Sequence, residues 1–164
     1  MNIEIRKYNN NNIPEMTKIW NDIIDEGTSF PWDEHFSPEK VQYVLSQQTA
    51  TYCAYADNEL VGYYLLHPNS SGRCKHVANG LYAVEKEFRG IGIGTKLIIH
   101  SLHEAKKHGF TAMQYNSVVA INPSMSIYKK IGFEQVGIIK NGYKLINGNY
   151  SDLVIFYMLL QDFE

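Results

Sequence analysis

A glycine-rich segment constrains the fold of this chain more than any other feature. It consists of Arg89, Gly90, Ile91, Gly92, Ile93, Gly94 and Thr95. An apolar stretch that ends at Val84 precedes it, and an amphipathic stretch that ends at His108 follows it. Glycines let the backbone approach a ligand closely, and the free N–H groups at a helix start favour an anion. The pattern therefore predicts a strand–turn–helix unit that binds a phosphate or pyrophosphate, with Arg89 as an added charged contact.

Two common phosphate-binding motifs do not fit this segment. The dinucleotide fingerprint needs glycine where Thr95 stands and an acid about 20 residues further on, but residues 110–119 contain neither Asp nor Glu. The ATP-binding loop needs four residues between its glycines, whereas Gly90 and Gly94 are separated by three. We therefore predict a pyrophosphate site without magnesium-dependent hydrolysis. A plain tight turn into a helix is the structural alternative.

Composition excludes several other classes of protein. The 164 residues include 15 Lys plus Arg and 17 Asp plus Glu, a net charge of −2, so the basic excess of a nucleic-acid binder is missing. The longest strongly apolar run, Leu153 to Leu160, is far shorter than the ~20 residues of a membrane span. Cys53 and Cys74 are too few for a disulfide scaffold or zinc finger. We expect one cytoplasmic domain over residues 1–164, with reduced thiols and with no nucleic-acid or membrane partner.

Apolar periodicity and turn residues predict a mixed α/β domain. Helices are expected at 14–24, from Ser37 to about Gln47, from the glycine segment to His108, and from Asn122-Pro123 to just before Gly132. Strands are expected at 3–8, 51–56, 60–67, 77–84, 112–119, 134–140 and 151–160. Gly80 weakens one of these strands and indicates a bulge or a close backbone approach. The order predicts one mixed sheet flanked by helices.

Arg89, Gly92 and Gly94 match the pattern [QR]-x-x-G-x-[GA], and residues 122–133, from Asn122 to Phe133, are similar to the pattern N-x-x-[AS]-x-x-[LI]-Y-x-K-x-G-F. With these two segments the chain resembles the GNAT superfamily of acetyl-CoA-dependent N-acetyltransferases. The element order fits the family over nearly the whole chain. Lys86 departs from it, because many members have proline there. The resemblance implies a mixed, mostly antiparallel sheet of about 6–7 strands with about four helices and a V-shaped gap between central strands.

The resemblance also implies how acetyl-CoA binds as cosubstrate. The turn from Arg89 to Thr95 would hold the pyrophosphate, and Asn122 would contact the pantetheine arm, a role compatible with capping the next helix. Backbone groups of the strand before the turn would pair with that arm as an added strand would; these residues are Leu81, Tyr82, Ala83 and Val84. Unpaired main-chain groups at an opened sheet edge suit an amide-bearing ligand.

Tyr128 resembles the family tyrosine that protonates the departing thiolate of coenzyme A, because a thiolate leaves faster when it receives a proton or hydrogen bond. A core aromatic on a short helix is the alternative interpretation. Lys129 and Lys130 could reach nucleotide phosphates, although solubility is the commoner reason for paired surface lysines.

The sequence does not identify the base that takes the proton of the amine. Glu26, expected in the loop after the first helix, is one candidate, either as the base or as an ion-pair partner of the cationic acceptor. His76 and Asn79 are others, although Asn79 could only hold a water. His100, His103 and Glu104 share metal-like spacing, but they do not form H-E-x-x-H. We interpret those three as a solvated helix face and expect no metal.

The segment from Asp25 to Phe36 combines four acids with three large aromatics, which suits an amine that is cationic until it reacts. It resembles members that acetylate small amino-acid-like compounds such as phosphinothricin. We expect direct acetyl transfer to the primary amine of a small molecule. A homodimer is compatible with this expectation. The alternatives are acetylation of a protein or peptide amine, and a non-catalytic acyl-CoA sensor. An ordinary polar loop remains the alternative for residues 25–36.

Overall fold

The computed structural model describes all residues, Met1 to Glu164, and contains one seven-stranded sheet in the order β1-β2-β3-β4-β5-β7-β6. Every neighbouring pair is antiparallel except β4 and β5. The strands are β1 (Ile3–Lys7), β2 (Ala50–Ala56), β3 (Glu59–Pro68), β4 (Val77–Val84), β5 (Ala112–Val119), β6 (Glu134–Lys144) and β7 (Tyr150–Leu159). This confirms the mixed, mostly antiparallel sheet expected from the sequence.

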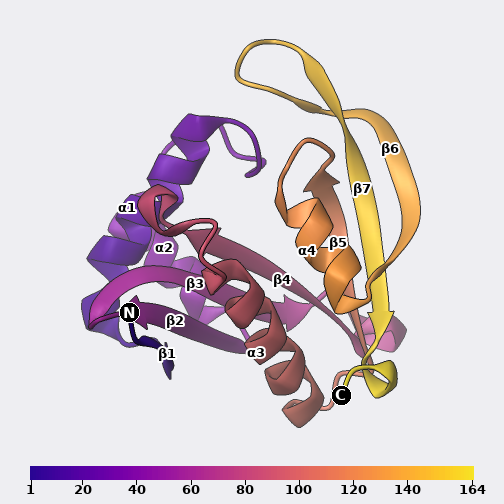
Figure 1. Cartoon of the computed structure of the whole chain (residues 1–164), viewed down its shortest axis with the longest axis horizontal. Coiled ribbons are helices and arrows are strands. Elements are labelled where there is room, and N and C mark those ends of the chain that lie inside the picture. The colour runs from indigo at the N-terminus through magenta and orange to yellow at the C-terminus, as the bar shows by residue number, and fades with distance from the viewer.

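Four α-helices cover the sheet, with two on each side (Figure 1). They are α1 (Ile13–Glu26), α2 (Pro38–Ser46), α3 (Ile93–Lys107) and α4 (Ser124–Ile131). One apolar core lies under α1 and α2 and includes Tyr63 and Leu65, whereas Tyr64 and Leu66 belong to the core under α3 and α4. Strand β3 is therefore buried on both faces, which explains its nearly continuous apolar sequence.

The sheet opens between its two central strands. β4 and β5 pair only at Val77↔Ala112 and Ala78↔Met113, although both strands continue beyond these residues. The rest of β4 pairs with β3 alone, as far as Gly62↔Val84. Figure 1 shows β5, β7 and β6 turning away from β4 beyond this junction. The V-shaped gap between central strands is thus present, with one edge of β4 unpaired.

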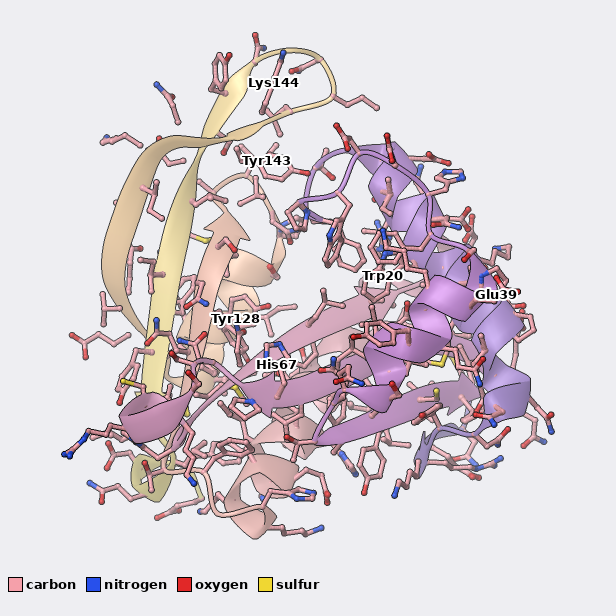
Figure 2. All side chains as sticks on the ribbon, turned by 180° about the vertical axis from the view of Figure 1, so that it is seen from behind. Trp20, Glu39, His67, Tyr128, Tyr143 and Lys144 are labelled. Atoms are coloured by element: carbon pink, nitrogen blue, oxygen red, sulfur yellow. The ribbon has the colours of Figure 1, made fainter.

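The β6–β7 hairpin closes over the connection between α1 and α2. Tyr143 Oη donates a hydrogen bond to the carbonyl of Phe30 at 2.6 Å, and the backbone N–H of Ile146 donates to Gly27 O at 3.1 Å. Ile146 packs so closely on Gly27 that a Cβ there would lie 2.5 Å from the Cβ of Ile146. Two segments far apart in the sequence therefore meet over the open side of the sheet (Figure 2).

Most predicted boundaries hold to within about two residues, and three differences matter. The first helix runs to Glu26, not 24, because Gly27 adopts the left-handed conformation (φ 59°) that ends it. The sixth strand continues to Lys144, since the hairpin reaches the α1–α2 connection. Gly80 marks no bulge in the β3–β4 register; a Cβ there would lie 2.9 Å from Tyr82 Oη, so a close approach explains the glycine.

Candidate cofactor and acyl-transfer site

The glycine turn places the start of α3 at the open end of the β4–β5 gap. Gly90 (φ 79°) and Gly92 (φ 92°) are left-handed, and Gly92 is the N-cap of α3. A Cβ at either position would meet no atom within 4 Å, so open space surrounds the turn. The first N–H groups of a helix have no intrahelical partner and carry a partial positive charge. The turn therefore presents an open backbone surface whose partial positive charge suits an anion.

Arg89 and Glu26, both expected to serve the site, are paired with each other. The Arg89 guanidinium donates two hydrogen bonds to the Glu26 carboxylate at 2.7 and 2.8 Å, and its Nε donates to Val84 O at 2.9 Å. Lys18 binds Glu85 at 3.0 Å beside this pair. Glu26 is the last residue of α1 rather than part of the following loop. The pair fastens α1 to the glycine turn.

Tyr128 lies on α4, among aromatic rings on the other side of the gap from β4. Its ring centre is 4.6 Å from that of Tyr115 and 5.4 Å from that of Phe156. The side chain of Asn122 accepts a hydrogen bond from Ser124 N at 2.9 Å and so fixes the entry to α4. Burial raises the pKa of Tyr128, so its hydroxyl keeps its proton at neutral pH.

The expected acceptor loop is largely an aromatic cluster. Trp20 of α1 packs against Phe30, Trp32 and Phe36 with ring centres 5.0–5.2 Å apart. Phe30 and Phe36 are buried, which gives them the structural role left open in the sequence, whereas Trp32 is 36% exposed. Asp25 belongs to α1, like Glu26, and binds His35 at 2.7 Å.

Of the two remaining candidates for the base, His76 precedes β4 and Asn79 lies within that strand. His76 is exposed, and its Nδ1 faces Arg73 O at 3.1 Å. Asn79 donates to the side chain of Asn69 at 3.2 Å. A third residue, His67, is not indicated by any sequence motif; it pairs in register with Asn79 on the face of β3 that carries Leu65.

In Figure 2, which views the sheet from the side of α1 and α2, His67 lies between the two halves of the sheet. Its Nδ1 faces Pro68 O at 2.9 Å. Because a carbonyl only accepts, Nδ1 carries the hydrogen and Nε2 is left with the lone pair. The sequence signal for this residue was a lone titratable group at the end of an apolar strand.

The interpretation of His100, His103 and Glu104 as a solvated face is wrong for two of the three. Glu104 is buried and accepts hydrogen bonds from Tyr52 at 3.1 Å and Lys107 at 2.6 Å, and His100 meets Tyr64 Oη at 2.9 Å. Burial alone would raise the pKa of Glu104, but those hydrogen bonds hold it below its usual value. The tyrosines of β2 and β3 reach up to α3 and draw this helix face into the interior. No group of three or more metal-ligating side chains forms here or elsewhere.

None of the helices combines the length and the apolar character that a membrane span requires.

A sheet opened beside a glycine-rich helix start is an arrangement for a ligand with both a phosphate group and an extended amide-bearing arm. The model of the Acetyltransferase (GNAT) family matches residues 16–133. The chain belongs to this family.

Two relatives and one solved structure illustrate the similarity. The N-acetyltransferase aca1 of Schizosaccharomyces pombe is 36% identical over 99 residues, which cover 59% of this chain and 47% of aca1. An N-alpha-acetyltransferase of Sulfolobus acidocaldarius is 34% identical over 115 residues, or 63% of this chain and 67% of the relative. The chain thus spans about half the length of aca1.

The solved structure is a phosphinothricin acetyltransferase of Sinorhizobium meliloti in complex with acetyl-CoA. It superposes with a TM-score of 0.91 at 18% identity, and the match covers 97% of this chain and 89% of that one. At this identity the likeness concerns the fold, which it confirms over nearly the whole chain.

Proposed function

We propose that this chain transfers the acetyl group of acetyl-CoA directly to the primary amine of a small, amino-acid-like molecule. The observation that carries the proposal is the unpaired edge of β4 beside the free N–H groups at the start of α3. The family supports the acetyl transfer, and the relatives are named as N-acetyltransferases. The structural neighbour that holds acetyl-CoA has the same fold.

In this proposal the backbone supplies most of the cofactor contacts. The pyrophosphate accepts hydrogen bonds from the turn residues Gly90, Ile91, Gly92, Ile93, Gly94 and Thr95. The pantetheine amides pair with the free edge of β4 at Tyr82, Ala83 and Val84, and the side-chain NH2 of Asn122 donates to the same arm. Arg89 contributes by holding the turn against α1 through Val84 O and Glu26. The open space at Gly90 and Gly92 fits a bulky anion.

Tyr128 is the proposed general acid. The amine nitrogen attacks the thioester carbonyl, the carbon–sulfur bond breaks, and the sulfur leaves with the electron pair. Tyr128 donates its proton to that sulfur and regains one from solvent. The raised pKa of Tyr128 keeps the hydroxyl protonated, and therefore a hydrogen-bond donor, before the bond breaks.

His67 is the proposed base. Its lone pair lies on Nε2, because Nδ1–H is engaged by Pro68 O. A neutral imidazole with a free lone pair can take the proton that the attacking amine loses. Glu26 is engaged by Arg89, and the amide of Asn79 has no basic lone pair for this step.

The α1–α2 connection and the β6–β7 hairpin form what we call the acceptor side. Because this side is enclosed, it favours a small amine. The hairpin is tied to the α1–α2 connection at Phe30 and Gly27, so the open side of the sheet is bridged rather than left as a groove. We infer that this bridge obstructs a continuous polypeptide, although a chain terminus could enter. The α-amine of a peptide N-terminus is therefore the second candidate, and the N-alpha-acetyltransferase relatives favour it.

The test is a panel of free amino acids, their analogues and short peptides with free N-termini, scored by thiol release from acetyl-CoA. We expect turnover with at least one small amine. Turnover with peptides alone would transfer the proposal to protein N-termini. Acetyl-CoA binding without any thiol release would point to a non-catalytic sensor. The homodimer stays a prediction, which light scattering of the purified chain would check.

A further inference from the structure

Two tyrosine hydroxyls join the strands where the backbone no longer does. Tyr82 of β4 and Tyr115 of β5 lie on the α3 face, beyond the last paired residues Ala78 and Met113. Their hydroxyl oxygens are 2.7 Å apart, and Tyr82 Oη is 2.6 Å from the hydroxyl of Ser101 on α3. A side-chain link thus closes the narrow end of the gap on the α3 face.

The direction of this hydrogen-bond chain follows from its last member. Ser101 Oγ donates to Ile98 O at 2.7 Å, so it accepts from Tyr82, whose oxygen in turn accepts from Tyr115. Burial raises the pKa of Tyr82 to about 12, so the proton stays in place. The hydroxyl hydrogens of Tyr115, Tyr82 and Ser101 are therefore all used within this series of hydrogen bonds, which ends at Ile98 O.

The neighbouring residues are fitted to this pair. Gly80 leaves room for the Tyr82 hydroxyl, because a Cβ at that position would lie 2.9 Å from the oxygen and 3.3 Å from Leu65 O. Tyr115 is buried, whereas Tyr82 is only half-buried. The ring of Tyr115 lies 4.6 Å from the ring of Tyr128, the residue assigned above to the leaving sulfur. The hydroxyl pair therefore adjoins the thioester end of the gap.

We propose that the Tyr82–Tyr115 pair is the end wall of the acyl site and restricts the enzyme to acetyl groups. This rests on the proposed function, since it needs the thioester beside Tyr128. A longer apolar acyl tail would have to separate hydroxyls that are hydrogen-bonded to each other, and would leave buried polar groups without partners. A two-carbon acyl group ends before the wall.

The test compares acetyl-CoA with butyryl-CoA on the wild type and on Tyr82→Ala, using calorimetry for binding and thiol release for turnover. We expect the wild type to prefer acetyl-CoA in kcat/KM by at least about tenfold. Tyr82→Ala should raise the butyryl-to-acetyl ratio by at least about tenfold. Tyr52→Ala is the matched control, because Tyr52 is also half-buried but its hydroxyl binds Glu104, and the ratio should stay unchanged.

If Tyr82→Ala does not fold, Tyr82→Leu keeps more volume and should move the ratio in the same direction, by about threefold. A wild type that uses both acyl groups equally would overturn the inference, as would a folded variant that binds acetyl-CoA with an unchanged ratio. A wild type that fails to bind acetyl-CoA would instead overturn the proposed function.

Discussion

The proposed cofactor site and the proposed acceptor side of this molecule are built in opposite ways. The proposed cofactor site is mainly backbone from two adjoining segments, the free edge of β4 and the turn that leads into α3. The acceptor side joins the α1–α2 connection to the β6–β7 hairpin, at positions such as Phe30 and Tyr143 that are 113 residues apart. One side is local and made of main chain, and the other is long-range and made of side chains.

This difference determines which of the two sides can be recognised in a sequence. Main-chain chemistry requires glycines and a helix start at fixed spacing, so a sequence can reveal it. Side-chain pockets depend on which distant loops meet, and their residues vary without any change in fold. We therefore expect substitutions in the turn to abolish function outright, and substitutions on the acceptor side to adjust it.

Gly92→Asp should have the largest effect. It places a side chain and a negative charge in the proposed pyrophosphate-binding turn, and like charges in contact cost several kcal/mol, which corresponds to at least about 100-fold in affinity. Acetyl-CoA binding measured by calorimetry should be lost while circular dichroism stays native. Gly72→Asp is the control, because Gly72 is also left-handed (φ 59°) and open, but lies in another loop. Normal affinity in a folded Gly92→Asp would remove the proposed pyrophosphate site.

Tyr128→Phe should have the second largest effect. The ring stays and the proton donor goes, so kcat should fall by about 10²-fold with acetyl-CoA affinity little changed. Since burial raises the pKa of Tyr128, the wild-type rate should show no loss from tyrosine ionisation up to about pH 9. Tyr63→Phe, which removes a buried hydroxyl bonded to Met16 O, should keep normal turnover. Equal rates for both variants would make Tyr128 a packing residue.

The same contrast governs what the sequence could foresee. The element order, the start of α2 at Ser37 and the glycine turn are local, and the structure has them as expected. The engagement of Glu26 by Arg89 spans 63 residues, and no spacing rule announces it. The burial of Glu104 was also hidden, because it depends on Tyr52, 52 residues away, reaching up to α3. The sequence indicates a close approach at Gly80, but the group that approaches, the Tyr82 hydroxyl, is defined only by the tertiary structure.

His67→Ala tests whether this side chain, which no sequence motif indicates, serves the acceptor side. Loss of the base should lower kcat/KM for the amine by about tenfold or more at pH 7, and by less at pH 9, where free amine is abundant. The acetyl-CoA affinity should not change, because the backbone edge of β4 is untouched. His76→Ala, an exposed histidine, should leave the pH profile as in the wild type. If the two histidine variants exchange these results, His76 is the base.

Glu26→Gln should have the smallest effect, and this variant distinguishes between two roles for Glu26. As a base, Glu26 would lower kcat on loss, most strongly at low pH; as an ion-pair partner of the amine, it would raise KM alone. The structure gives its carboxylate a different partner, since both oxygens accept from Arg89. Both side chains are partly exposed, 24% for Glu26 and 39% for Arg89, so solvent screens the pair and its loss should cost at most about 1 kcal/mol of stability. We therefore expect kcat and KM for the amine to match the wild type from pH 6 to 9, with a small fall in Tm that Arg89→Gln reproduces. A raised KM confined to Glu26→Gln would return this residue to the acceptor side and extend that side to the end of α1.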